Sequence, residues 1–376
     1  MRVLGLMSGT SLDGIDAAII ETDGVTISGF GPAATFPYSP AERAALVEAI
    51  ADALLGPPES AWPASFAAAE AAILDSHARA ARALLAMADA GAVDLLGFHG
   101  QTVLHRPEHH LSIQLGNGAA LARSTGIDVV ASMRQADLAA GGQGAPLVPV
   151  YHAALADRIG AARPVAFLNI GGVANLSWIG RDGRIIAFDT GPGNGLIDQL
   201  MEERGLGTFD ADGRLARSGR VDDDAFACLL VNDFLQRRGP KSLDRYDFTL
   251  DAVRALDAAD AAATLTAFTA ACVALSAAHL PEAPRQWIIC GGGRHNPALM
   301  DALRLELGTC ISADELGLRG DAIEAEAIAF LAARSAAGLA LTFPETTGVP
   351  HAMTGGQRFA ASPGGALQTA SGMTKR

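Results

Sequence analysis

The sequence predicts an α/β protein made of two similar halves. Short apolar runs of strand character alternate with alanine-rich segments of helical pattern, which is typical of sheets covered by helices. Each half begins with a glycine-containing β-hairpin, and the length of 376 residues favours two domains. The glycine- and proline-rich segment GGQGAPLVP, at residues 141–149, places the boundary between the halves just upstream of it.

The first half is predicted to start with two strands and continue into helices. The strands cover Arg2–Met7 and Ile15–Glu21 and are joined by the turn SGTSLDG. Alanine-rich helices are expected over residues 42–55 and 65–90. A short buried strand over residues 94–98 then ends in HGQT.

The second half repeats this beginning. Val165–Ile170 is a predicted strand that continues through GGVANLSWIG. The tripeptide RDG at residues 181–183 is expected to turn the chain, so that Ile185–Phe188 returns as a second strand. The small, polar tail after Ser362 is expected to fray.

Composition favours a small-molecule ligand over a nucleic acid. The 41 acidic and 28 basic side chains give a formal net charge of −13, whereas phosphate backbones are bound by surfaces rich in lysine and arginine. If the small molecule is an anion, backbone amides, helix N-termini and a metal ion must supply the positive field around it.

Cysteine usage and the N-terminus predict a cytoplasmic protein. The four cysteines form no CxxC pair, and the first apolar run is too short for a signal peptide. Residues 261–280 carry no charge, but they are rich in alanine and threonine. Their larger apolar residues recur at helical spacing, which favours a buried helix over a membrane span.

Two glycine-rich loops, each with an aspartate, predict a phosphate site divided between the halves. In GLMSGTSLDGIDAA, glycine amides and hydroxyls suit a phosphate, and Asp13 and Asp16 suit a metal ion. In AFDTGPGNGL, Asp189 ends a predicted strand and suits a general base, while Asn194 can cap a helix whose N-terminus attracts an anion. Neither loop matches GxxxxGK[ST] or GxGxxG. The alternative is that each aspartate only binds local amides.

Three further segments add to this predicted site. NIGGVANLS offers more backbone amides, and GGGRHNP, with Asn296 and Pro297 at a helix start, suits packing against a nucleobase or ribose. A zinc site in HRPEHH is disfavoured because its histidines lack a helical frame with a third ligand. Neutral hydrogen-bonding side chains suited to a sugar come from HGQTVLH, namely His99, Gln101, Thr102 and His105.

Taken together, these motifs are similar to those of the anhydro-N-acetylmuramic acid kinase family. In chain order they are MSGTSLDGIDAA, GFHGQTVLH, QLGNGAALA, GGQGAPLVP, NIGGVANLS, FDTGPGNGLID, GGGRHNP and the late GDAIEAEA. The resemblance implies two RNase H-like domains of the sugar kinase, Hsp70 and actin superfamily, with an ATP and substrate cleft between them. We expect the first domain over residues 1–130, completed by a C-terminal segment near 345–376, and the second over residues 131–344.

The reaction implied by the resemblance joins ring opening to phosphorylation. A water molecule opens the 1,6-anhydro ring of the sugar at C1, and the released O6 takes the γ-phosphoryl group of ATP. The products are N-acetylmuramic acid 6-phosphate and ADP, and Mg²⁺ is the expected metal cofactor. The expected partners are ATP and a small amino sugar, without nucleic acid or membrane, and a homodimer is compatible with the sequence.

The expected site residues fall into three groups, and the metal ligands stay unassigned. Asp189 is the expected catalytic base toward water. ATP is expected to meet Gly9, Thr10, Ser11, Leu12, Asp13, Gly14, Ile15, Asp16, Asn169, Gly171, Gly172, Gly191, Gly193, Asn194, Gly291, Gly292, Gly293 and Asn296. The sugar is expected to meet His99, Gln101, Thr102, Arg134, Asp137 and Glu324.

The chain departs from the family pattern at two places near this site. Ser132 and Met133 precede Arg134 where an Asp-Phe-Arg run is usual, and Leu243 and Asp244 replace a Thr-Gly pair. Both departures affect detailed contacts rather than the reaction. An ordinary sugar kinase, in which Asp189 deprotonates a sugar hydroxyl, is one alternative. An ATPase switch that binds a protein is another, but HGQT and Asp189 favour a small polar acceptor.

Overall fold

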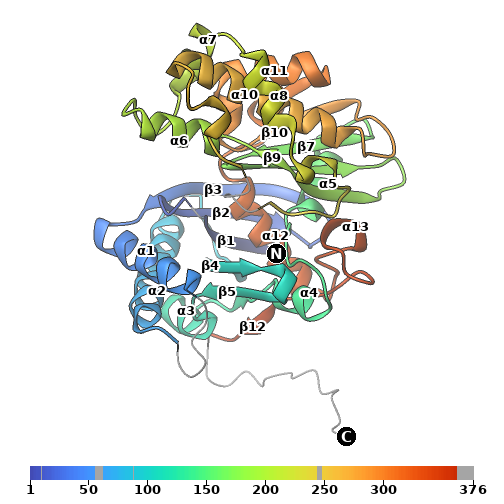
Figure 1. The fold of residues 1–376 in the computed structure, drawn as a ribbon. Coiled ribbons are helices and arrows are strands. Elements are labelled where there is room, and N and C mark those ends of the chain that lie inside the picture. Colours follow the sequence, from blue (N-terminus) through green and yellow to red (C-terminus); the bar gives the residue numbers. More distant parts are fainter. Residues whose placement is uncertain (10, 56–61, 88, 244–247, 362–376) are drawn as a thin grey trace, which may run out of the picture.

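Two β-sheets lie one above the other in the computed structural model, each with helices against it (Figure 1). The structure describes residues 1–361 apart from 10, 56–61, 88 and 244–247. The predicted fraying of the tail after Ser362 therefore lies outside the described residues.

The first sheet starts as an antiparallel meander and continues with parallel strands. The meander is β1 (Arg2–Ser8), β2 (Gly14–Thr22) and β3 (Ile27–Pro37). On the other side of β1, β4 (Leu95–Arg106) and β6 (Val129–Ala131) run parallel to it. Two antiparallel strands complete the sheet: β5 (Leu111–Leu115) pairs with β4, and β12 (Gln357–Phe359) pairs with β6.

The second sheet repeats the same plan. Its meander is β7 (Val165–Ile170), β8 (Val173–Ile179) and β9 (Ile185–Pro192). Beyond β7 follow the parallel strands β10 (Gln286–Cys290) and β11 (Cys310–Ser312). The shared strand order confirms the structural duplication that the two predicted hairpins indicated.

Helices cover both faces of each sheet. On the first sheet, α1 (Pro40–Leu54), α2 (Ala64–Leu85) and α3 (Gly118–Thr125) lie on one face and α12 (Ile323–Ala336) on the other. On the second, α10 (Ala258–Ala277) and α11 (Pro297–Leu307) cover one face and α5 (Pro149–Arg158) the other. The short helices are α4 (Gln135–Ala139), α6 (Gly195–Glu203), α7 (Arg214–Ser218), α8 (Asp223–Leu230), α9 (Asp233–Gln236) and α13 (Pro344–Thr347). The 3-10 turns are η1 (Pro107–His109), η2 (Ala211–Gly213), η3 (Asp251–Val253), η4 (Gly292–His295) and η5 (Ala313–Leu316).

Helix α12 lies directly on two glycines of the first sheet. Gly5 of β1 and Gly97 of β4 are register partners. A Cβ atom at Gly5 would overlap the carbonyl oxygen of Ala325, and one at Gly97 would overlap that of Ile328. Only glycine therefore allows the helix backbone to come this close. Because α12 packs on this sheet, we propose that the chain returns to the first domain before residue 323 rather than near 345.

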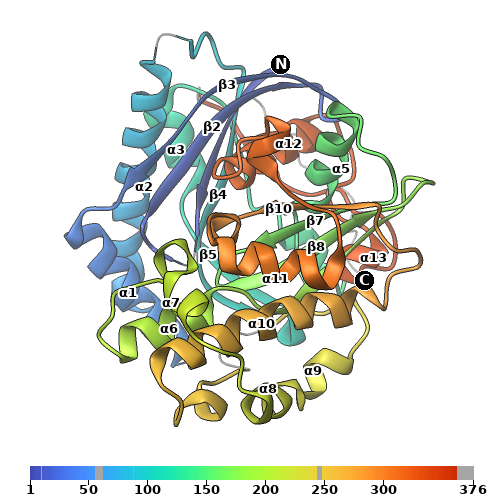
Figure 2. The same ribbon diagram turned by 90° about the horizontal axis from the view of Figure 1, so that it is seen from above.

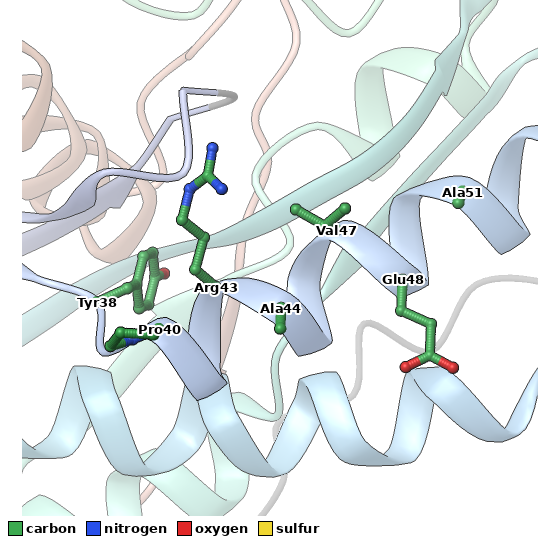
Figure 3. Close-up of a pocket in the computed structure, with 7 residues that line it drawn as sticks. All are labelled: Tyr38, Pro40, Arg43, Ala44, Val47, Glu48 and Ala51. Atoms are coloured by element: carbon green, nitrogen blue, oxygen red, sulfur yellow. The ribbon is translucent and has the colours of Figure 1, made fainter.

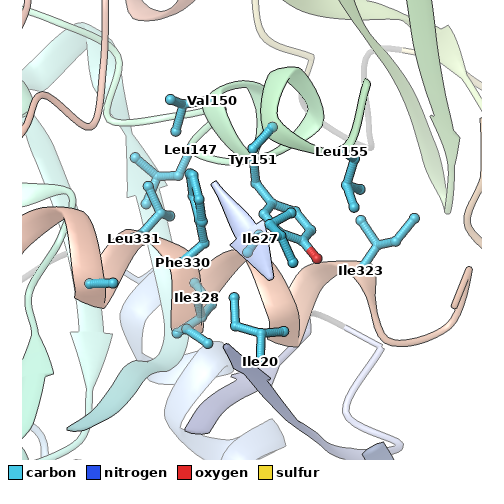
Figure 4. Close-up of a cluster of buried hydrophobic side chains, with 14 of the residues drawn as sticks. Ile20, Ile27, Leu147, Val150, Tyr151, Leu155, Ile323, Ile328, Phe330 and Leu331 are labelled. Carbon is cyan, nitrogen blue, oxygen red and sulfur yellow. The ribbon is translucent and has the colours of Figure 1, made fainter. Parts of the chain in front are cut away.

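Helix α12 also shares a core with α5 from the other half of the chain (Figures 2 and 4). Apolar side chains of both helices and of both sheets form one buried cluster. Inside it, the Tyr151 hydroxyl donates a hydrogen bond of 2.5 Å to Oε2 of Glu326, and Nε of Arg319 donates one of 2.6 Å to Oε1. Burial raises the pKa of Glu326, while the Arg319 cation lowers it. The contact between Tyr151 and Glu326 therefore links α5 of the second half to α12 on the first sheet.

Three predicted strand limits were wrong, two because of pairing with another strand and one because a local two-residue turn was missed. The strand predicted over 94–98 extends to Arg106 because HGQTVLHR pairs with β5. The strand predicted to continue past Ile170 turns at Gly171–Gly172, and β8 returns antiparallel to β7. The strand predicted to end near Asp189 continues to Pro192, since β8 still pairs with it there.

The uncharged segment near residue 270 forms a core helix. By length and composition, α10 is the one helix among the described residues that could cross a membrane, and 61% of its most apolar window is buried inside the protein. Its side chains pack among α6, α8 and the second sheet. The predicted buried helix is thus confirmed.

Gly5→Ala is expected to lower the free energy of unfolding by about 2 kcal/mol, because its methyl group overlaps backbone that cannot move alone. The thermal unfolding midpoint, measured by calorimetry, tests this. Gly29→Ala on β3 is the matched control, since its methyl group would meet mainly the movable Glu21 side chain. Equal midpoints for the two variants would contradict the proposed close contact.

Candidate active site

Strand register places three polar side chains side by side on the second sheet. Asn169 of β7 pairs with Asn175 of β8, and Asn175 pairs with Asp189 of β9. Register partners share a face of the sheet, while the residues next to them along each strand point the other way. Those neighbours include Leu168, Leu176 and Phe188, and they belong to the apolar core under α10 and α11. Alternation therefore places these three polar side chains, called the polar row below, on the face opposite that core.

Asp189 is held by a loop that passes over it. Its backbone N–H donates a hydrogen bond of 3.0 Å to the carbonyl of Lys241, and its Oδ2 accepts one of 2.8 Å from the N–H of Leu243. Within the described residues, Oδ1 has no hydrogen bond. Burial raises the pKa of this carboxyl to about 6, while the Leu243 N–H and the Lys241 charge lower it. The group suits the transfer of a proton near neutral pH.

Lys241 fixes the loop that binds Asp189. Its Nζ donates a hydrogen bond of 3.0 Å to the carbonyl of Phe234 and lies 4.3 Å from the centre of that ring. Burial lowers the pKa of its ammonium group to about 8. Asp244, one of the two departures in this loop, lies outside the described residues.

A cavity of about 190 Å³ lies over this polar row. Asp189 and Arg134 line it, together with Glu324 from the first turn of α12. Nδ2 of Asn169 donates a hydrogen bond of 3.4 Å to Glu324, whose pKa is raised by burial and by the Asp16 charge. The full lining is Arg134, Ala145, Pro146, Val148, His152, Asn169, Asn175, Asp189, Ser242, Ile323 and Glu324.

Arg134 is oriented by His99. Nδ1 of His99 lies 2.8 Å from the Gly100 carbonyl, and because a carbonyl can only accept, this nitrogen carries the proton. Its Nε2 then accepts a hydrogen bond of 2.8 Å from Arg134, which also donates one of 2.7 Å to the Gly144 carbonyl. Burial lowers the pKa of His99 to about 3 and that of Arg134 to about 10, so the arginine alone is charged. The structure places His99 behind Arg134, outside the cavity lining.

Two other residues predicted to meet the sugar also bind the protein itself. Gln101 is fully buried and donates a hydrogen bond of 3.1 Å from Nε2 to the Gly9 carbonyl. Asp137 accepts hydrogen bonds of 2.6 Å from the N–H of Gly144 and from the hydroxyl of Thr347. Thr102 lies beside Gln101 and pairs with Gln114 of β5. None of these lines the cavity, whereas Arg134 and Glu324 do.

The glycine turns of the second domain pack against one another. The N–H groups of Gly193 and Gly195 donate to the Gly172 carbonyl at 2.9 and 3.1 Å, and that of Asn194 donates to Gly171 at 2.7 Å. These three amides are therefore already bonded. Asn194 begins α6 as predicted, but its side chain forms no capping hydrogen bond. Asn296 does cap α11, accepting from the Leu299 N–H at 3.1 Å.

The glycine turn at residues 291–293 lies against the end of β7, just before the turn at Gly171–Gly172. Gly291 has a φ of 73°, and a Cβ atom there would overlap the Asn169 side chain. Gly292 and Gly293 begin η4. Arg294 fixes the turn with hydrogen bonds of 2.7 Å to Asp314 and 2.8 Å to Asp321.

The first glycine loop lies between β1 and β2. Ser11 Oγ donates a hydrogen bond of 2.7 Å to Asp13, and Thr35 Oγ1 donates one of 2.6 Å to Asp16. Leu12 is buried with a φ of 55°. Thr10 lies outside the described residues, a Cβ atom at Gly9 would lie 3.6 Å from Oγ of Ser11, and Gly14 and Ile15 start β2. Burial raises the pKa of Asp16, as do the charges of Asp13 and Asp321.

Two hollows lie away from the polar row. One of about 240 Å³ is lined by Asp16, Thr35, Arg319 and Asp321 among others, so it adjoins the first loop. The other, of about 590 Å³, lies along α1 between Tyr38 and Ala51 and contains no predicted site residue (Figure 3). Among the residues that the structure describes, no group of three or more His, Cys, Asp or Glu could hold a metal ion.

Two polar residues of the cavity wall, His152 and Ser242, were given no individual role from the sequence. Ser242 belongs to the PKS tripeptide after Gly239, and His152 lies on the buried side of α5. A histidine in an otherwise apolar helical stripe, directly after GGQGAPLVP, is the signal that would have drawn attention to His152.

Comparison with known proteins gives consistent matches over almost the whole chain. The family model for anhydro-N-acetylmuramic acid kinase matches residues 1–361. A curated anhydro-N-acetylmuramic acid kinase of Rhodospirillum rubrum is 51% identical over 361 residues, covering 96% of this chain and 94% of that protein. One of Caulobacter vibrioides is also 51% identical, over 367 residues, covering 95% and 98%.

Solved structures are more distant. Component A of (R)-2-hydroxyglutaryl-CoA dehydratase from Acidaminococcus fermentans is 12% identical, with a TM-score of 0.48 over 90% of this chain and 99% of that one. A ROK family glucokinase from Streptomyces griseus, in complex with glucose and AMPPNP, is 15% identical, with a TM-score of 0.39 over 88% and 99%. Because both TM-scores are below 0.5, we infer nothing about the site from these two structures.

Asp137→Ala is expected to lower the free energy of unfolding by about 2 to 3 kcal/mol, since it leaves two buried donors without acceptors. Calorimetric unfolding measures the loss. Asp301→Ala is the control, because Asp301 forms only exposed ion pairs. A stable Asp137→Ala protein that had lost only sugar binding would instead favour the direct sugar contact predicted from the sequence.

Proposed function

We propose that this chain, which belongs to the anhydro-N-acetylmuramic acid kinase family, converts 1,6-anhydro-N-acetylmuramic acid, water and ATP into N-acetylmuramic acid 6-phosphate and ADP. Family membership supports an ATP-dependent sugar kinase of cell-wall recycling. Within the site, the supporting observation is the Asp189 carboxylate beside the cavity, whose Oδ2 is bonded, whose Oδ1 has no hydrogen bond from the described residues, and whose pKa is raised.

Asp189 is the proposed general base. Its unbonded Oδ1 takes a proton from the water that attacks C1, while the C1–O6 bond breaks and its electrons go to O6. O6 then forms a bond to the γ-phosphorus of ATP, and ADP leaves. The Leu243 N–H holds the carboxylate, and the Lys241 carbonyl holds the backbone N–H of Asp189, so the group does not have to reorient at the moment of reaction.

The sugar is proposed to lie between Arg134 and Glu324. The guanidinium is held by His99 and Gly144 and suits the carboxylate of a muramic acid. Glu324, at the start of α12, suits the sugar hydroxyls as an acceptor. Gln101 and Asp137 support this region through the first loop and the Gly144 loop.

ATP is proposed to lie along the glycine turns, with its phosphates at the loop from Gly9 to Asp16. The amides of Gly193, Asn194 and Gly195 are already bonded, so these residues support the turn more than the phosphate. Among the other glycines predicted to meet ATP, Gly171, Gly172 and those at 291–293 are proposed to contact the nucleotide. Mg²⁺ neutralises phosphate charge when bound with ATP. Asp13 and Asp16 would hold it, since burial and the charge of Asp13 raise the pKa of Asp16 in its absence.

The remaining expectations follow from the family and the composition. We propose a cytoplasmic protein whose partners are ATP and an amino sugar. A net charge of −13 supports the expectation that nucleic acid is not bound. A homodimer stays compatible with the sequence.

Asp189→Asn is expected to lower kcat by about a thousandfold while leaving the Kd of ATP nearly unchanged, because an amide cannot accept the proton. Steady-state kinetics and nucleotide titration measure the two quantities. Asp198→Asn is the matched control: burial also raises the pKa of Asp198 to about 6, but it lies on α6 outside the cavity lining. Near wild-type turnover of Asp189→Asn would remove this residue from the base role.

The pH dependence of kcat/KM should show an acidic limb with an apparent pKa near 6. Burial raises the pKa of Asp189 to about 6, so below that pH the carboxyl is protonated and cannot accept a proton. Activity should therefore fall about tenfold per pH unit below 6. A limb near pH 4 would show that this carboxyl titrates like an exposed one.

A kinase assay in ¹⁸O-labelled water tests the proposed reaction as a whole. Hydrolytic ring opening places the solvent oxygen on C1 of the phosphorylated product, which mass spectrometry detects. A phosphorylated product without label would point to an ordinary sugar kinase. ATP hydrolysis that does not depend on the sugar would point to an ATPase switch.

A further inference from the structure

His152 is fixed in position on the wall of the active-site cavity. It lies on α5 and is only 2% exposed. Its ring stacks on that of Phe167, with centroids 4.6 Å apart and planes inclined by 4°. Its Nδ1 lies 2.9 Å from Oγ of Ser177, which fixes the rotation of the ring. Both the plane and the direction of the imidazole are therefore set before any ligand binds.

The other ring nitrogen, Nε2, is buried and has no hydrogen-bond partner among the described residues. A buried polar atom without a partner costs about 1 to 3 kcal/mol, so such an atom at a cavity wall points to a ligand group that completes it. Burial lowers the pKa of His152 to about 3, so the imidazole is neutral. Nε2 of the neutral ring can therefore form one hydrogen bond, but it has no charge that would attract an anion.

His77 shows why the cavity matters. It is also fully buried, its Nδ1 lies 2.8 Å from the Ile73 carbonyl, and its Nε2 is likewise unpartnered in the described chain. His77, however, packs against Phe98 within the first domain and lines none of the three cavities described above. An unpartnered nitrogen alone is thus insufficient, and the location of His152 carries the inference.

The pairing register of β7, β8 and β9 places His152 close to the proposed base, Asp189. Phe167, on which the ring lies, pairs with Ser177, and Asn175 pairs with Asp189. Ser177 and Asn175 are two residues apart on β8 and therefore face the same side of the sheet, roughly 7 Å from each other. His152 thus covers the row of side chains next to the row that holds Asp189, and both residues line the same cavity.

We propose that His152 is a substrate-binding residue whose Nε2 forms a hydrogen bond with an uncharged polar group of the sugar, a hydroxyl or the acetamido group. The assignment rests on the proposed kinase function. Ser177 acts through the ring as a positioning residue, since its hydroxyl can donate to Nδ1 or accept from it.

Two substitutions separate the nitrogens of the ring. Glutamine can place a polar atom near Nε2, whereas asparagine can place one only near Nδ1. Three single variants, His152→Asn, His152→Phe and Ser177→Ala, are each expected to raise the KM for the anhydro sugar about 5- to 10-fold. The KM for ATP should stay unchanged. His152→Gln should stay closer to the wild type. His77→Phe is the matched control and should leave both KM values unchanged.

Each other outcome overturns a defined part of the proposal. A sugar KM within twofold of the wild type in both His152→Asn and His152→Phe would overturn the contact. Equal effects of asparagine and glutamine, or an equal effect of His77→Phe, would assign the change to general loss of packing. A wild-type enzyme that does not turn over the anhydro sugar would overturn the proposed function itself, and this assignment with it.

Discussion

The close contact of α12 with Gly5 and Gly97 is the constraint on which the rest of the molecule depends. The two glycines are register partners in adjacent parallel strands, and together they allow a helix backbone to lie on the sheet. The position of the helix decides where its first turn falls, and that turn carries Glu324 into the cavity. The opposite side of α12 shares its core with α5, so one helix relates the first sheet to the polar row of the second.

The chemistry of the site follows from an elementary property of strands. Because side chains alternate between faces, Asn169, Asn175 and Asp189 meet on the side toward α5, while the residues between them close an apolar core. On the side toward α5, burial raises the pKa of Asp189 and lowers that of His152. Packing and reactivity therefore have a common physical origin here.

Most local signals in the sequence were interpreted correctly, although the two-residue turn at Gly171–Gly172 was missed, whereas pairings between distant segments were not predicted. The SGTSLDG hairpin and the Asn296 cap with Pro297 were predicted because a turn or a cap needs only neighbouring residues. The continuation of β4 past Gly100 depends on pairing with β5, which no local pattern shows. Likewise, the motif that contains His99 indicates a polar site, but only the fold shows that its Nε2 accepts from Arg134. The bonded amides of Gly193 to Gly195 were missed because their acceptors lie over twenty residues away.

The environment of Asp189 sets two selective pressures against each other. Raising a carboxyl pKa from 3.8 to about 6 means that the folded protein holds the charged form about 3 kcal/mol less well than the unfolded chain does at neutral pH. That difference is a sizeable part of the net stability of a typical domain. Replacing this acid is therefore expected to stabilise the fold while removing the group proposed as the base.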